Sequence, residues 1–146
     1  MSRFCPSVLL VCLASAACPA QEADPAHPPM VADGGGLILI APSRSGRTLY
    51  GYSMQTGAWE GIAVIKPDGA PLVPIVSSGL GYVVAGKRIY ALSGGTGKWA
   101  VVELAKEATP KLAVGSRLRV DDGSTIHMYS AVVGRWSSVN LAGDEK

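Results

Sequence analysis

Short apolar runs separated by Gly, Pro, Ser and Asp dominate the sequence from residue 31 onward. No window keeps the i, i+3, i+4, i+7 spacing of an amphipathic helix. The nearest approach, 102–110, is ended by Pro110 within about two turns. Runs of four to seven apolar residues between turn residues are typical of β-strands. We therefore predict an all-β domain over 31–146.

The apolar runs repeat with the three tryptophans, which are 40 and 37 residues apart. Aligned on Trp59, Trp99 and Trp136, segments 49–64, 89–104 and 126–141 share a Ser, a Gly and the Trp itself. The shared glycines are Gly57, Gly97 and Gly134, and the shared serines are Ser53, Ser93 and Ser130. A fixed period of this length indicates repeated structural units, which we place at about 31–66, 67–105 and 106–141.

Each unit is predicted to hold about four strands. A strand, a turn whose glycine takes positive φ, and a strand opened by the Trp form a hairpin. An earlier strand is predicted at 36–41, 81–86 and 117–120, and another at 71–78 and 109–114, with the first unit's counterpart near 29–33. In a strand, residues 89 and 91 point to one face and residues 90 and 92 to the other, and all four are apolar. Both faces are therefore expected to be covered, which predicts sheets stacked unit on unit.

The stretch Tyr-Ser-Met-Gln-Thr-Gly-Ala-Trp at 52–59 resembles the blade motif Tyr-Asp-x-x-Thr-Asn-x-Trp of kelch-type β-propellers. It is also similar to the Thr-Gly repeat of quinoprotein-type propellers. Ser replaces the motif's Asp, the kelch double glycine is absent, and the period is nearer 40 than the ~50 usual for kelch. The resemblance implies propeller blades; since propellers close with about 4–8 blades, two copies would complete a six-bladed ring. A β-trefoil, with three repeats in one chain, is the alternative.

Residues 1–20 are a predicted secretory signal peptide. Arg3 precedes an apolar run over 4–17 and small residues, with cleavage expected after Ala20 or, alternatively, Ala16. The run is shorter than the ~20 residues of a spanning helix. All three cysteines, Cys5, Cys12 and Cys18, lie here, so cleavage after Ala20 would leave no disulfide or thiolate.

The stretch 15–18 weakly resembles a bacterial lipoprotein signal, in which Cys18 would carry a lipid anchor. A Pro-rich tether over 21–30 follows. We expect a secreted or periplasmic protein of a bacterial envelope, held at a membrane only if Cys18 is lipidated.

Charge and composition disfavour several partners. The net charge is +2, or +1 once Arg3 is removed, and the basic residues form no cluster, so nucleic acid is not expected. The Gly-rich stretch 91–99 is not a phosphate loop, since Leu92 and Trp99 occupy its required Gly and hydroxyl positions. His27 falls in the tether and His127 in the column of Tyr50 and Tyr90, so neither a metal nor a cofactor is expected.

The candidate ligand surface is the rim formed by the turns at 42–47, 86–88 and 121–123 and the connections at 66–71 and 105–111. These segments differ between units, and loops on a rigid scaffold often carry function. The candidate contact residues are Arg44, Arg47, Asp68, Lys87, Arg88, Asp121 and Asp122. Two adjacent carboxylates can bind Ca²⁺ or supply a base, but Asp-Gly is also a preferred hairpin turn, and a solvated charged rim is the simpler interpretation.

We interpret the chain as an exported, non-catalytic binding or scaffolding protein with a protein partner, or a second copy of itself, as its target. A carbohydrate-binding module is the alternative, and a propeller-type enzyme is the third possibility. The secreted chain offers neither a Cys, a His pair nor a repeated carboxylate column, so catalysis is not expected. The repeated Trp, Gly and Ser positions are interpreted as structural.

Overall fold

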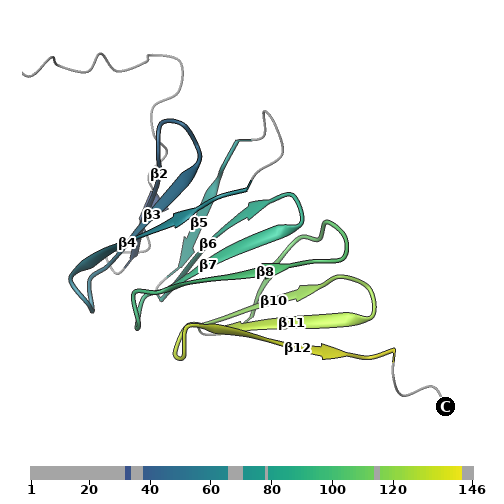
Figure 1. The fold of residues 1–146 in the computed structure, drawn as a ribbon. Helices are drawn as coiled ribbons and strands as arrows, with labels where there is room; N and C mark the ends of the chain where they lie inside the picture. The colour runs from purple at the N-terminus through teal and green to yellow at the C-terminus, as the bar shows by residue number, and fades with distance from the viewer. Residues whose placement is uncertain (1–31, 34–37, 66–70, 78, 114–115, 143–146) are drawn as a thin grey trace, which may run out of the picture.

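A computed structural model describes residues 32–33, 38–65, 71–77, 79–113 and 116–142. The described residues contain 12 strands and no helix, which confirms the all-β prediction. The strands form three four-stranded antiparallel sheets, and each sheet is built from four consecutive strands (Figure 1). The predicted signal peptide, its three cysteines, His27 and the whole tether lie outside the described residues.

The three sheets follow one another along the chain. The first sheet contains β1 (Ala32–Asp33), β2 (Ile38–Pro42), β3 (Thr48–Ser53) and β4 (Ala58–Ala63). The second contains β5 (Pro74–Ser77), β6 (Leu80–Ala85), β7 (Arg88–Ser93) and β8 (Trp99–Glu103). The third contains β9 (Lys111–Ala113), β10 (Arg117–Asp121), β11 (Thr125–Ser130) and β12 (Arg135–Asn140). Every strand falls on or beside a predicted run, and β1 supplies the first unit's fourth strand.

The hairpin that the repeat predicts is present in each sheet. Gly57, Gly97 and Gly134 have φ angles of 65°, 67° and 68°, which is the left-handed region expected for this turn. The residue before the repeated Ser pairs directly with the Trp on the next strand, as Tyr52 does with Trp59. Their rings lie 5.2 Å apart between centroids, and the pair at Tyr129 and Trp136 lies 5.3 Å apart.

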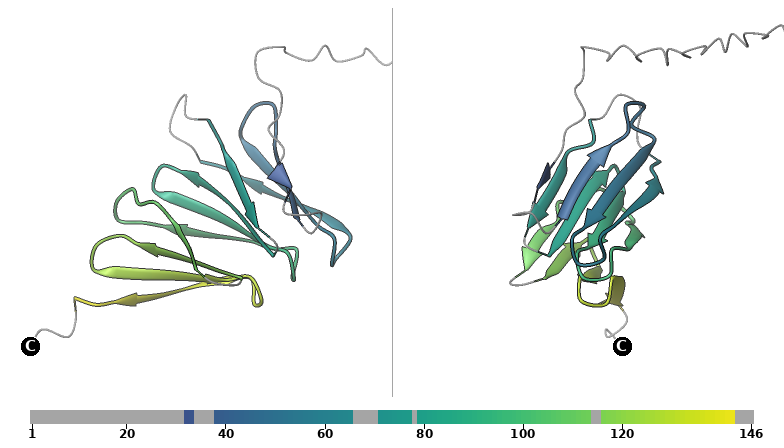
Figure 2. Two further views of the ribbon diagram at one scale, coloured as in Figure 1. Left: turned by 180° about the vertical axis from the view of Figure 1, so that it is seen from behind. Right: turned by 90° about the vertical axis from the view of Figure 1, so that its left-hand side faces the viewer.

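The second sheet is sandwiched between the other two, and the three sheets splay like a fan in the views of Figure 2. One buried cluster joins the first and second sheets and includes Ile38, Leu49, Tyr90 and Leu92. A second cluster joins the second and third sheets and includes Ile89, Ala91, Leu118 and Tyr129. The alternation along β7 therefore serves two cores, as the sequence predicts for a sheet covered on both faces.

The chain leaves each sheet in the same way. The backbone N–H of Val64 donates to the Arg47 carbonyl at 2.8 Å, and the N–H of Leu104 donates to the Lys87 carbonyl at 2.8 Å. Leu141 repeats the contact with Ser124 at 2.6 Å. Each exit segment is thus tied to the turn between the second and third strands of its own sheet, which fixes that end of all three units.

Candidate functional site

The charged rim is formed by turns at one end of the sheets. Arg44 and Arg47 are exposed in the β2–β3 turn, and Lys87 is exposed in the β6–β7 turn. Arg88 is half-buried, and its guanidinium lies 2.9 Å from the carboxylate of Glu103 on β8. Three of the seven candidate residues therefore present cationic side chains to solvent at the same end of two adjacent sheets. Asp68 lies outside the described residues.

The two adjacent aspartates are separated by the structure. Asp121 is exposed and lies 2.9 Å from Arg119, whose hydrogen bond lowers the pKa of that carboxyl. Asp122 is only 7% exposed, and its carboxylate accepts the backbone N–H of Ala105 at 2.8 Å. That hydrogen bond is the main reason why the pKa of Asp122 is lowered. Asp122 is therefore an interior residue and does not share a surface site with Asp121.

His127 is also buried and lies between Asp122 and Ser138. Its Nε2 atom is 3.3 Å from the Asp122 carboxylate, and its Nδ1 atom is 2.8 Å from the Ser138 hydroxyl. An ionised Asp122 favours a hydrogen on Nε2, and in the neutral ring Nδ1 then accepts the hydroxyl hydrogen of Ser138. Asp122, His127 and Ser138 thus stand in the order carboxylate, imidazole, hydroxyl, but the carboxylate only approaches Nε2, without a hydrogen bond between them.

Sequence reasoning missed this chain of contacts because its three members come from different elements. Asp122 lies in the β10–β11 turn, and His127 meets Ser138 through the register of β11 and β12. The available signal was the pairing of Tyr129 with Trp136. Once that pair is set, antiparallel counting places His127 opposite Ser138.

A comparison between units explains why Asp122 is buried. In the second unit, the Tyr90 hydroxyl accepts the backbone N–H of Ile65 at 2.9 Å. His127 occupies the column of Tyr90, and Ala105 is the counterpart of Ile65. The Asp122 carboxylate, in contact with His127, accepts the backbone N–H of Ala105. In the preceding unit the Tyr90 hydroxyl accepts the equivalent N–H of Ile65. This equivalence gives the carboxylate and the imidazole an architectural role.

A pocket of about 360 Å³ opens at the opposite end of the sheets from the charged turns. It is lined by turns of all three sheets, mainly the second and third, and much of its wall is backbone because three of its residues are glycines. The lining residues are Gln55, Gly79, Gly94, Gly95, Ser116, Ala131 and Val132. Sequence reasoning placed its candidate ligand contacts on the other rim; the visible signal for this pocket was the Gly94-Gly95 pair.

The repeated Ser and Trp connect neighbouring sheets. The Ser53 hydroxyl donates to the Gly94 carbonyl, and the Ser93 hydroxyl donates to the Ala131 carbonyl. A Ser at a turn also commonly bonds the backbone of its own turn. Such bonds are present as well, because the N–H of Thr96 donates to Ser93 Oγ at 2.9 Å, but the hydroxyl hydrogen is directed at the next sheet.

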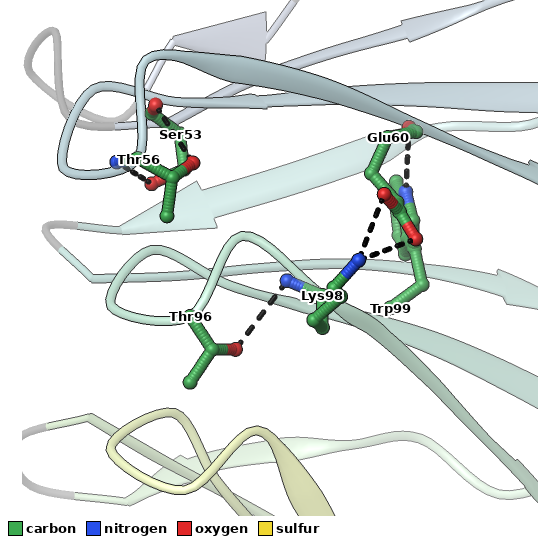
Figure 3. A network of polar contacts seen from close by, with 6 residues as sticks. All are labelled: Ser53, Thr56, Glu60, Thr96, Lys98 and Trp99. Carbon is green, nitrogen blue, oxygen red and sulfur yellow. Dashed lines mark hydrogen bonds and ion pairs between the residues drawn. The ribbon is translucent and has the colours of Figure 1, made fainter.

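The tryptophans bind in the opposite direction, toward the preceding sheet. The indole N–H of Trp99 donates to the Glu60 carbonyl at 3.0 Å, and that of Trp136 donates to the Ala100 carbonyl at 3.3 Å. Figure 3 shows Trp99 on Glu60, with the ammonium of Lys98 3.2 Å from the carboxylate of the same residue. Both indoles are half-buried by these contacts.

Trp59 has no preceding sheet to contact within the described residues, and it is 55% exposed. Tyr50 on the same face is 45% exposed. At the other end, the outer face of the third sheet exposes Val139 and Leu141. Trp99 and Trp136 are therefore packed against a neighbouring sheet, whereas Trp59 belongs to an open aromatic face.

Within the described ranges, no group of three or more His, Cys, Asp or Glu side chains is arranged to hold a metal ion. The same residues include no helix long and apolar enough to cross a membrane. No protein-family model matches the chain, and a search of the curated proteins gives no match.

Proposed function

We propose that this chain is an exported, non-catalytic β-propeller-type protein that binds or scaffolds another macromolecule, with its three sheets acting as blades. The observation that carries the proposal is that both sheet-to-sheet interfaces use the same positions: a Ser hydroxyl from one sheet and a Trp indole from the next. Each unit keeps its four strands in one sheet. This arrangement favours blades over a β-trefoil, in which the repeats share one barrel.

The proposed binding surface is the charged rim. Arg44, Arg47 and Lys87 present exposed cations on turns that the backbone contacts of Val64 and Leu104 tie down. Arginine binds carboxylates through two parallel hydrogen bonds, which gives geometric specificity as well as charge attraction. The partner that fits this rim is a protein or envelope polymer that presents carboxylates.

Site-specific photocrosslinking in the envelope of the producing cell tests the rim. A crosslinker at position 47 should capture a discrete partner, and the double substitution Arg44→Glu and Lys87→Glu should abolish the capture without changing secretion. A crosslinker at Gln55, on the opposite rim, is the matched control. Equal capture from both positions, or capture that survives the charge reversal, would contradict the rim assignment.

Carbohydrate binding is the second candidate because Tyr50 and Trp59 form an exposed aromatic face. Aromatic rings that combine an apolar surface with a polar edge suit ligands with mixed apolar and polar faces. A glycan array probed with the secreted protein and with Trp59→Ala distinguishes this candidate. Hits that vanish in the variant would support it, and an empty array would exclude the glycans displayed there.

The non-catalytic assignment makes a prediction at Ser138. If the Asp122–His127–Ser138 contacts serve only the fold, a fluorophosphonate probe should label the folded protein no more than it labels Ser138→Ala. Saturable labelling that Ser138→Ala abolishes, while Ser137→Ala retains it, would show an activated serine. Such labelling would replace the proposal with acyl-transfer chemistry.

A further inference from the structure

We infer that the outer face of the first sheet and the outer face of the third sheet bind each other between two copies of this chain, head to tail. This inference rests on the blade interpretation proposed above and names the partner of its two open ends. The proposed interface is a third instance of the contact that already joins the first sheet to the second and the second to the third.

Each half of the recurring polar contact is present on an open face. The third sheet carries Ser130, the counterpart of Ser53 and Ser93, and its hydroxyl would donate to the Met54 carbonyl of the second copy. The first sheet carries Trp59, whose indole N–H would donate to the Ser137 carbonyl. Among the described residues, neither of these two donors has a hydrogen-bond acceptor in its own chain.

The glycine turns show the same pattern of contacts between neighbouring sheets. Thr56 lies against Gly97, and Thr96 lies against Gly134, so that an added Cβ at either glycine would be within 3 Å of a threonine hydroxyl. Gly57 has no described atom within 4 Å of such a Cβ. Its counterpart contact would come from Val133 of the second copy, which is exposed in the β11–β12 turn.

Burial of the apolar residue that follows the last strand of each sheet depends on whether a next sheet is present. Val64 and Leu104 lie five residues after their tryptophans and are 8% and 3% exposed. Leu141, at the same place in the third unit, is 52% exposed. A first sheet from a second copy would cover Leu141 as the second and third sheets cover the other two residues.

Two positions distinguish this interface from the internal ones. Arg117 and Arg119 lie on the outer face of β10. The position of Arg117 is held by Ile38 in the first sheet and Leu80 in the second. The position of Arg119 is held by Ile40 and Tyr82. Opposite the two arginines the first sheet presents an aromatic face, and guanidinium groups stack favourably on aromatic rings. The contact between copies is therefore more polar than the internal contacts, as suits a surface that must stay soluble before assembly.

A second copy is the occupant that the pattern selects. The Ser130 hydroxyl and the Trp59 indole each have an acceptor at the equivalent position on the other open face, and the aliphatic side chains on the third sheet match the aromatic face of the first. Two copies related by a twofold axis make the contact twice and join six sheets, which is within the range in which propellers close. Head-to-tail contacts form rings when the rotation closes.

The test is the mass in solution of the secreted protein, measured by sedimentation velocity. We expect twice the chain mass at micromolar concentration. Trp59→Arg on one face and Val139→Arg on the other should each yield a folded monomer, with at least tenfold weaker association. Ile65→Arg, an equally exposed apolar position in the connection after β4, is the control and should leave the dimer intact.

Mixing the two interface variants tests the orientation. Trp59→Arg retains the face of the third sheet and Val139→Arg retains that of the first, so their mixture should recover a heterodimer through one intact contact. A dimer of Val139→Arg alone would overturn the head-to-tail contact. A wild-type monomer with an intact thermal transition would overturn self-association altogether, while the rim crosslinking, which does not depend on mass, would still report on the proposed function.

Discussion

The backbone N–H of Ala105 is bound by a carboxylate, whereas its counterpart at Ile65 is bound by a tyrosine hydroxyl. A carboxylate accepts such a bond more strongly than a neutral oxygen does, but only while it is ionised. These two equivalent hydrogen bonds between neighbouring sheets therefore differ in their response to acid. The bond between the second and third sheets is the one that we expect to weaken at low pH.

The predicted pH dependence follows from the lowered pKa of Asp122. Because the pKa is lower in the folded chain than in the unfolded chain, the folded state binds fewer protons near that pKa. The resulting stability is present above the ordinary carboxyl pKa of about 4 and is lost as the pH falls through the folded value. Thermal melts from pH 7 to pH 2.5 should therefore show wild type above Asp122→Asn at pH 7, with the gap closing in acid.

Glu107→Gln provides the matched control for that comparison, because Glu107 is an exposed carboxylate in the connection just after Ala105. Its melting temperature should follow that of wild type across the whole pH range. A gap between wild type and Asp122→Asn that stays constant with pH would show that the variant acts through shape and not through charge.

The three tryptophans should not be equivalent in stability. Trp99→Ala removes a ring that packs on the first core cluster and donates to Glu60, so we expect a loss of about 3 kcal/mol, at the lower end for a large aromatic residue. Trp59→Ala loses mainly its contact with Tyr52, worth about 1 kcal/mol. Denaturant unfolding in the Val139→Arg background keeps the copies apart. Equal losses would show that Trp59 is packed within its own chain.

At the scale of the elements, the Gly turn offers a matched pair of substitutions. Gly57 and Gly134 have nearly the same positive φ, so changing either to Ala carries a similar backbone cost of about 1 kcal/mol. An added Cβ at Gly134 would also lie 2.6 Å from Thr96 Oγ1. In the same monomeric background, Gly134→Ala should therefore destabilise the chain more than Gly57→Ala. Equal losses would mean that Thr96 turns away at no cost.

The strands and their grouping were predictable because both depend on local and periodic signals. Apolar runs between turn residues located the strands, and the Trp, Gly and Ser columns located the hairpins, whose geometry is set within a few residues. The two-sided pattern of β7 predicted a sheet with two cores. These features need no knowledge of which segments meet far apart in the sequence.

The remaining features depended on contacts between units. Asp122 resembled a surface turn residue because its neighbour Gly123 fits that role, and only the approach of Ala105 from the previous unit explains its burial. The hydroxyl of Ser53 meets a carbonyl 41 residues away. Trp59 matches Trp99 in the repeat alignment but differs from it in exposure. The alignment gives a residue's place within its own unit, but it does not tell which other unit lies against that residue.

At the scale of the whole molecule, export is testable directly. We expect the protein recovered from the periplasm or medium to begin at Gln21, and intact mass with N-terminal sequencing checks this expectation. Processing as a lipoprotein would instead leave Cys18 as a lipid-bearing first residue and place the protein in the detergent phase. Cys18→Ser distinguishes the two routes: release after Ala20 should continue unchanged, whereas lipid attachment should stop.

The charged turns lie at one end of every sheet, and this has a consequence for the proposed ring. A twofold axis perpendicular to the plane of the ring would place the Arg44, Arg47 and Lys87 clusters of both copies on the same side of the ring. A partner with repeated carboxylates would then be held at two points, with an avidity well above the affinity of either cluster. Dilution that separates the copies would release such a partner without any change in either binding surface.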